Sequence, residues 1–182
     1  AQFGRVDIVF NNAGVMLPGD DDAESTTDEV IDRTLAINVK GVIHGCRHGI
    51  PALRRAGGGS IINMGSVSTT RAGTNPGYSA SKVGMLGLTE TAAYFYAPDN
   101  IRCNLVSPGH VDTPFIRESN PHSPNTWSTS IENPENYQRR VNSTPMGRIL
   151  TAEDIAPAFL FLASDDAAMC SANNYMVEAG SI

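Results

Sequence analysis

The sequence predicts an α/β fold in which helices cover both faces of a parallel sheet. Two observations carry this prediction. Short apolar runs end at glycine, proline or asparagine, and helical stretches of more than ten residues separate them. Neighbouring parallel strands need a crossover between them, and such crossovers are normally right-handed. The length of 182 residues favours a single domain over residues 1–182.

Four strands are predicted from the apolar runs. Residues 6–11, 60–64 and 101–106 are rich in β-branched and other apolar side chains, as buried parallel strands are. Residues 174–177 are expected to form a last, shorter strand.

Long helices are expected between these strands. The first begins at a capping box of Thr26 and Glu29 and continues towards Pro51. The second runs from Tyr78 to about Tyr96, after an Asn-Pro-Gly start signal.

The C-terminal part has a long polar connection and one further helix. Residues 113–144 contain only scattered apolar side chains and are predicted to be a loop that covers the substrate. Thr151 then caps a helix over residues 152–163, whose acidic first turn suits the helix dipole.

Composition excludes several classes of function. Thirteen basic against nineteen acidic residues give a net charge of −6, which disfavours nucleic acid and anionic membranes as partners. No apolar stretch approaches the roughly 20 residues of a membrane span. The three cysteines form no CxxC pair, so we expect neither a disulfide framework nor a zinc ribbon, and a reducing, cytoplasmic location.

Other polar clusters are expected to be structural. His44 and His48 are one helical turn apart, but no third ligand is evident, and we expect no metal. The acidic run 20–22 is expected to be a solvated loop. His110 and His122 are expected near the substrate mouth, as loop residues or as substrate contacts.

The best candidates for chemistry surround the second long helix. Tyr78 and Lys82 are four residues apart, so they share one helix face, and an ammonium group lowers the pKa of a nearby phenol. Ser66 follows the strand 60–64 and could hydrogen-bond the same substrate oxygen. Asn38 stands in mid-helix, where asparagine is disfavoured. Taken singly, each candidate also has a structural interpretation. Tyr78 and Lys82 could be a surface pair, Ser66 a turn residue, and Asn38 a side chain that bends the helix.

Five motifs together resemble the short-chain dehydrogenase/reductase family. They are NNAG at 11–14, NVKG at 38–41, Ser66, YSASK at 78–82 and NLVSPGHVDTP at 104–114. Three later segments are similar to the C-terminal part of that family: PMGR at 145–148, AEDIA at 152–156 and FLASD at 161–165.

The resemblance implies a Rossmann-like doubly wound parallel sheet and a site that binds NAD or NADP. Tyr78 would be the general acid or base, and Lys82 would lower its pKa and hold the nicotinamide ribose. Ser66 would orient the substrate oxygen, with Ser68 as an alternative, and Asn38 would hold a water of a proton relay. The residues implied around the cofactor, besides Tyr78 and Lys82, are Asn11, Ala13, Gly14, Pro108, Gly109, Val111 and Thr113.

Departures from the family concern the two ends of the chain. The glycine-rich turn and the residue that selects NAD or NADP are absent, so we expect the C-terminal portion only, with the first βαβαβ half missing. The strand 6–11 would then be an exposed edge, and these residues alone would bind cofactor poorly. Near the C-terminus, Ala172 and Ala179 stand where the family has glycine.

The function implied is an NAD(P)-dependent oxidoreductase that interconverts a secondary alcohol and a ketone. The alternative is a catalytically silent binding or structural subunit that lacks the cofactor half. The resemblance also implies a homotetramer built partly on the two long helices. Within residues 113–144, Phe115, Trp127 and Tyr137 are candidate apolar contacts for a small-molecule substrate.

Overall fold

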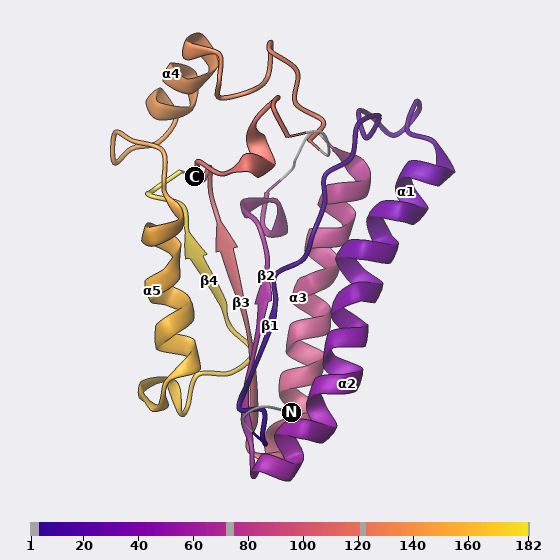
Figure 1. Ribbon diagram of the computed structural model, residues 1–182, viewed down its shortest axis with the longest axis vertical. Helices are drawn as coiled ribbons and strands as arrows, with labels where there is room; N and C mark the ends of the chain where they lie inside the picture. Colours follow the sequence, from indigo (N-terminus) through magenta and orange to yellow (C-terminus); the bar gives the residue numbers. More distant parts are fainter. Residues whose placement is uncertain (1–3, 72–74, 121–122, 182) are drawn as a thin grey trace.

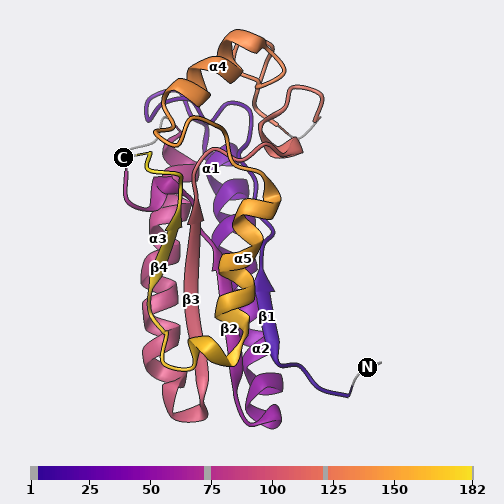
Figure 2. The same ribbon diagram turned by 90° about the vertical axis from the view of Figure 1, so that its left-hand side faces the viewer.

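The computed structural model describes residues 4–71, 75–120 and 123–181. Its parallel sheet has the strand order β1-β2-β3-β4, and all three pairs are parallel (Figures 1 and 2). The strands are β1 (Ile8–Asn11), β2 (Gly59–Met64), β3 (Ile101–Pro108) and β4 (Asn174–Val177). The predicted strands and the α/β class are confirmed.

Helices cover both faces of the sheet (Figure 1). One face carries a continuous rod made of α1 (Asp28–Leu35), a π-helical turn (Ala36–Lys40) and α2 (Gly41–Ala56), beside α3 (Pro76–Tyr96). The other face carries α5 (Ala152–Ala163). Within the described ranges, no helix is both long and apolar enough to cross a membrane.

The N-cap of the first helix differs by one residue from the prediction. Thr27, not Thr26, occupies the cap, and its side chain accepts a hydrogen bond from the Val30 N–H. The Thr26 hydroxyl instead donates to the Asp22 carbonyl, so Thr26 belongs to the preceding turn. Adjacent threonines offer the same capping chemistry, and only the backbone conformation selects between them.

Alternating side chains on the strands divide the apolar core into two layers. On β2, Ile61 packs into a cluster with Leu53 of α2 and Met85 of α3. Its neighbour Ile62 points to the opposite face, into a cluster with Leu162 of α5. This two-sided burial explains why apolar residues occupy adjacent positions in β2 and β3 rather than strictly alternating with polar ones.

One crossover departs from the expected handedness. The steps from β1 to β2, β2 to β3 and β3 to β4 all go in the same direction across the sheet. However, α2 and α3 lie on one face and α5 on the other, so the crossover through α5 has the opposite hand to the other two (Figures 1 and 2). The prediction of uniformly right-handed crossovers is therefore wrong. Because residues 109–151 separate β3 from α5, strand twist no longer decides which face the helix covers.

The connection 113–144 is not a pure loop. It contains α4 (Pro134–Asn142), whose start is fixed by Pro134 at the first helical position and by the Asn133 side chain, which accepts from the Glu135 N–H. Six of the nine residues of α4 are polar or charged, so no apolar stripe indicated the helix. It lies above the carboxyl ends of the strands (Figure 1).

β1 forms an edge of the sheet in this chain. Ile8 and Phe10 are 46% and 49% exposed, and β1 pairs with β2 only, as the sequence predicted. Phe10 packs against Phe159 of α5, with ring centroids 4.3 Å apart.

Ala172 and Ala179 adopt backbone conformations that favour glycine. Their φ angles are +63° and +56°, in the left-handed region where the Cβ atom crowds the following carbonyl oxygen. Both flank β4, and Ala172 donates its N–H to the Cys103 carbonyl at 2.8 Å. The departure from glycine noted in the sequence thus introduces local strain around the last strand.

Replacing either alanine with glycine is expected to stabilise the protein. Ala172→Gly and Ala179→Gly should each raise the free energy of unfolding by up to about 1 kcal/mol, because glycine relieves the left-handed strain. Urea unfolding of the protein made from its complete reading frame measures this. Ala80→Gly, an exposed helical position in α3, is the matched control and should destabilise by about 1 kcal/mol. Destabilisation by all three changes would contradict the expectation.

Candidate active site

A large cleft opens at the carboxyl ends of the strands. Its volume is about 1360 Å³, which exceeds that of most small-molecule sites. The exits of β1, β2 and β3 form its floor, and α3, α4 and α5 contribute its walls. The cleft therefore lies at the sheet edge that the sequence indicates.

The start of α3 is held by a buried carboxylate. Asp20 is fully buried, and its two oxygens accept the N–H groups of Gly77 and Tyr78 at 2.8 and 2.7 Å. A carboxylate is stabilised there by the unpaired amides and the dipole of the helix. A Cβ on Gly77 would lie 3.2 Å from Asp20 Oδ1, so glycine allows this close approach. The expectation of a wholly solvated acidic run at 20–22 is wrong for Asp20.

The Asn38 side chain fastens the segment after β1 to the helices. Its amide accepts from the Val15 N–H and donates to the Val15 carbonyl, both at 2.8 Å, and it donates to Ser81 Oγ at 3.0 Å. Asn38 lies in the π-helical turn, and its mid-helix position is explained by these buried contacts. Both N–H donors of the amide are used, so a bound water would have to donate to Oδ1.

Lys82 is a buried cation without a carboxylate partner among the described residues. It is 5% exposed, lines the cleft, and donates to the Met64 carbonyl at the end of β2 at 2.9 Å. Burial lowers the pKa of Lys82 to about 8. Gly14 lies beside it, and a Cβ there would be 3.6 Å from Lys82 Nζ.

Tyr78 lies next to Lys82 and Ser66 in the cleft. The Lys82 ammonium is 5.6 Å from the centroid of the Tyr78 ring. Burial raises the pKa of Tyr78, and a hydrogen bond with the Ser66 side chain partly offsets this. The net direction is opposite to the lowered pKa that the sequence suggested, because desolvation outweighs the neighbouring groups.

Ser66 stands at the exit of β2 in a short capped turn. Its Oγ accepts the Ser68 N–H at 3.2 Å, and its backbone N–H donates to Thr69 Oγ1. Ser66 and Ser68 both line the cleft. The bond with Tyr78 favours Ser66 as the serine that shares an oxygen with the tyrosine.

Most residues implied around the cofactor lie together. The cleft is lined by Ala13, Gly14, Tyr78, Lys82, Pro108, Gly109, Val111 and Thr113. Ala13 is exposed, and the size of the cleft and the absence of a side chain at Gly14 fit one end of a dinucleotide. Asn11 is not among the lining residues. Its amide donates to Asn63 Oδ1 at 2.8 Å and packs on Gly45.

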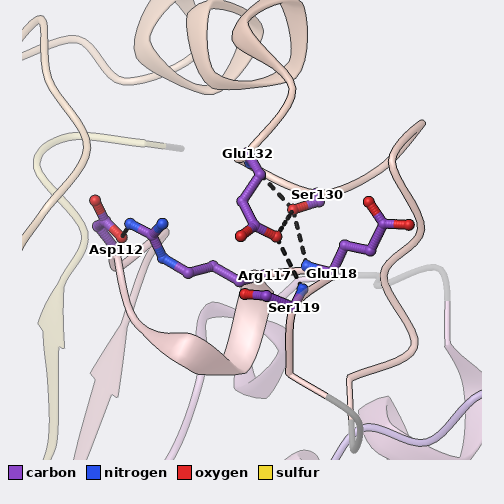
Figure 3. Close-up of polar contacts among 6 residues, drawn as sticks. All are labelled: Asp112, Arg117, Glu118, Ser119, Ser130 and Glu132. Atoms are coloured by element: carbon purple, nitrogen blue, oxygen red, sulfur yellow. Dashed lines mark hydrogen bonds and ion pairs between the residues drawn. The ribbon is translucent and has the colours of Figure 1, made fainter.

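The outer wall of the cleft is held by a polar network (Figure 3). The Glu118 N–H donates to Ser130 Oγ, and the Ser119 N–H donates to Glu132 Oε2, both at 2.9 Å. Ser130 is fully buried and also donates to Glu132 at 3.2 Å. These bonds join residues 118–119 to residues 130–132 and so hold these two parts of the connection together.

Only one of the three aromatic candidates lines the cleft. The Phe115 ring centroid is 6.2 Å from that of Tyr78. Trp127 and Tyr137 are 55% and 40% exposed and lie outside the lining. His110 lines the cleft, whereas His122 lies outside the described residues. Across the described ranges, no group of three histidine, cysteine or acidic side chains is placed to hold a metal.

Sequence reasoning missed part of the cleft wall. Arg139 and Arg140 of α4 and Phe159 of α5 line it. The two consecutive arginines were a visible signal, because the rest of the segment 113–144 contains only one other basic residue, Arg117.

Comparison with known proteins gives consistent matches. A family model described as enoyl-(acyl carrier protein) reductase matches residues 1–181. (+)-Borneol dehydrogenase 2 of Salvia officinalis is 38% identical over 98% of this chain and 63% of its own length. Cyclohexanol dehydrogenase of Acinetobacter sp. (strain SE19) is 34% identical over 97% of this chain and 64% of its own length. The crystal structure of levodione reductase has a TM-score of 0.88 and 33% identity, covering 98% of this chain and 67% of that one.

The chain therefore spans slightly less than two thirds of the length of these two curated relatives. The similarity extends over nearly the whole described sheet and its helices.

Removal of the Asp20 carboxylate is expected to loosen the start of α3. Asp20→Ala leaves two helix amides without their acceptor and should lower the free energy of unfolding by about 1–3 kcal/mol. Urea unfolding measures this, with Asp21→Ala as the control, since Asp21 is exposed. Equal stability of the two variants would contradict the role assigned to Asp20.

The buried Lys82 is expected to make stability rise with pH. Between pH 8 and 10 the amine is mostly neutral in the folded protein but protonated in the unfolded chain, whose lysine pKa is near 10.5. The unfolded state then binds more protons, so the free energy of unfolding should increase by about 2 kcal/mol across this window. Tyr78, whose pKa is raised by burial, opposes this increase only towards pH 10, where tyrosine in the unfolded chain begins to ionise.

Lys82→Met should remove that increase. The measurement is urea unfolding of both proteins without cofactor at pH 8, 9 and 10. Parallel pH profiles would show that Lys82 is not the group responsible.

Proposed function

The chain belongs to the short-chain dehydrogenase/reductase family, and we propose that it acts as an NAD(P)-dependent oxidoreductase that interconverts a secondary alcohol and a ketone. The observation that carries the proposal is the meeting of Ser66, Tyr78 and Lys82 in one cleft at the strand ends. A hydroxyl donor, a second hydroxyl and a buried cation beside them form a site for one substrate oxygen.

Tyr78 is the proposed proton donor during ketone reduction. Because burial raises its pKa, the phenol is fully protonated at neutral pH and ready to donate. Ser66 orients the substrate oxygen towards it by a further hydrogen bond. In the reverse direction the phenolate of Tyr78 accepts the proton of the alcohol and becomes the phenol again.

Lys82 stabilises the phenolate left after proton donation. Below a pH of about 8 its ammonium is charged, and it lies 5.6 Å from the Tyr78 ring centroid in a site with little water. Nζ has three N–H groups, and the Met64 carbonyl takes one. The remaining donors are available to a cofactor ribose or to a water that is also bonded to Asn38.

The nicotinamide cofactor, when bound, supplies or accepts the hydride. The residues proposed to hold it are Ala13 and Gly14 after β1, and Pro108, Gly109, Val111 and Thr113 after β3, with Asn11 supporting the floor through Asn63. Tyr78 and Lys82 border it from α3.

The relatives named above support an alcohol or ketone substrate. Their names give borneol, cyclohexanol and levodione. All three carry their oxygen on a ring carbon, and Phe115 beside Tyr78 offers an apolar contact for such a ring.

A homotetramer built partly on the two long helices is proposed for the assembled enzyme. On α3, Val83, Tyr94 and Phe95 are 51%, 80% and 66% exposed. Exposed apolar surface of this kind is typical of a face that contacts another subunit. A cytoplasmic location is proposed from the three unpaired cysteines.

Tyr78→Phe is expected to abolish turnover while leaving the fold intact. Loss of the proton donor should lower kcat by at least about 100-fold. The assay follows cofactor absorbance with cyclohexanol or borneol, using the protein made from its complete reading frame with either NAD or NADP.

Tyr137→Phe is the matched control, because that tyrosine is exposed and lies outside the cleft. Its turnover should equal that of the unaltered protein. Equal turnover in Tyr78→Phe would contradict the mechanism, and absence of turnover in the unaltered protein with every alcohol and ketone tried would favour the silent-subunit alternative.

A further inference from the structure

Three nitrogen-bearing side chains gather on one wall of the cleft. Arg139 and Arg140 come from α4, and His110 follows the end of β3. All three line the cleft. They belong to a different wall from the Tyr78 and Lys82 pair of α3, and nothing in the proposed proton transfer uses them.

The two arginines lack acidic partners among the described residues. Four ion pairs are formed there, by Arg5, Arg54, Arg117 and Arg148. Acidic residues outnumber basic ones by nineteen to thirteen, so scarcity of carboxylates is not the reason.

Nearby carboxylates have other partners or none. Arg117, on the same connection, is paired with Asp112 at 2.5 Å. Glu132 accepts from Ser119 and Ser130 instead of from α4 (Figure 3). Asp21 is the one carboxylate among the described lining residues, and it forms no ion pair with either arginine.

The contacts of Arg140 define the protonation of His110. Arg140 Nη1 is 2.9 Å from His110 Nδ1, and Nη2 donates to the Thr129 carbonyl at 3.2 Å. A guanidinium only donates hydrogen bonds, so Nδ1 must accept and the ring proton lies on Nε2. Burial, and then the charge of Arg140, lower the pKa of His110, which keeps the imidazole neutral. The histidine thus positions Arg140 without cancelling its charge.

The electrostatics of this wall are unbalanced. Arg140 is half-buried, and desolvation together with its neighbour Arg139 lowers its pKa. Arg139 donates to Asn136 Oδ1, a neutral acceptor. Arg139 is exposed and Arg140 is half-buried, and a partly desolvated guanidinium such as that of Arg140, with neutral partners only and a second cation beside it, is costly unless an anion is bound. Guanidinium is also the side chain best shaped for two-point binding of an oxyanion.

We propose that Arg139, Arg140 and His110 form a subsite that binds an anionic oxygen group, such as a carboxylate, carried by the substrate at a distance from its reacting carbon. This inference rests on the proposed function, and it narrows the substrate class to anionic alcohols and ketones. The anionic group of the substrate would be bound by residues of α4 and of the exit of β3, while Tyr78 of α3 would transfer the proton.

A graded series of probes tests the subsite. The probes are the methyl-ketone acids 4-oxopentanoate, 5-oxohexanoate and 7-oxooctanoate, each paired with its neutral methyl ester. Affinity is measured by calorimetry on the complete protein carrying Tyr78→Phe, with saturating cofactor, so that no turnover disturbs binding. kcat and KM are measured on the protein with Tyr78 intact.

At least one acid is expected to bind ten or more times more tightly than its ester, because charge-assisted hydrogen bonds are lost in the ester. Arg140→Gln and Arg139→Gln should reduce this preference at least tenfold, mainly through KM. Arg140→Lys should keep part of it. Arg117→Gln is the matched control, because that arginine is already paired and lies outside the cleft lining; it should leave the preference unchanged.

The outcomes separate this proposal from the proposed function. If no acid binds more tightly than its ester, or if the preference survives both glutamine variants, the subsite is wrong, even when neutral ketones are reduced. If the arginine variants raise the KM of the cofactor and not that of the acid, the anion is a cofactor phosphate, and the proposal also fails. If acids bind through the arginines but no ketone is reduced, the subsite stands and the proposed reaction fails.

Discussion

The carboxylate of Asp20, buried against the first amides of α3, is the contact on which the geometry of the cleft depends. It ties the segment after β1 to the helix that carries Tyr78 and Lys82. Asn38 makes a second tie between the same segment and the helices, through Val15 and Ser81. Burying a carboxylate is costly unless it is fully hydrogen-bonded, so the helix start and the loop can form only together. The contacts of Asp20 and Asn38 thus form together and fix the position of Tyr78 relative to the sheet.

The charge of the cleft runs against the charge of the chain. The protein is acidic overall, yet Lys82, Arg139 and Arg140 all face the cleft, and among its described lining residues Asp21 is the one acid. A positive site within a negative molecule focuses anions at the site and repels them elsewhere. Both a dinucleotide and an anionic substrate suit such a field. Lys82 contributes its positive charge only below a pH of about 8, because burial lowers its pKa to that value.

Local signals in the sequence predicted most helices and strands, whereas features that depend on long-range contacts were not predicted. The strands 60–64 and 101–106 and the helix 152–163 were recognised because apolar runs and a Thr151 cap are local features, and the structure has the matching capping box with Asp154. α4 was missed because a polar helix has no apolar period to detect. The hand of the α5 crossover depends on a connection too long for strand twist to control.

The site residues were likewise predicted from local motifs, whereas their environments were not. Ser66, Tyr78 and Lys82 were found from sequence motifs, and they meet in the cleft. The shift of the Tyr78 pKa was misjudged, because spacing reveals a neighbouring charge but not the loss of solvent. Asp20 was taken for part of a solvated run for the same reason: three adjacent aspartates look alike until a helix N-terminus lies over one of them.

The residues proposed for proton transfer and those proposed for substrate recognition stand on separate elements of the fold. Tyr78 and Lys82 stand on a long helix packed against the sheet, where a small displacement would cost buried apolar contacts. Arg139 and Arg140 stand on α4, a short polar helix whose connection is held by the hydrogen bonds around Ser130 (Figure 3). Hydrogen bonds near the surface open at lower free energy than a packed core. The proposed substrate wall can therefore move while the proposed proton donor stays in place.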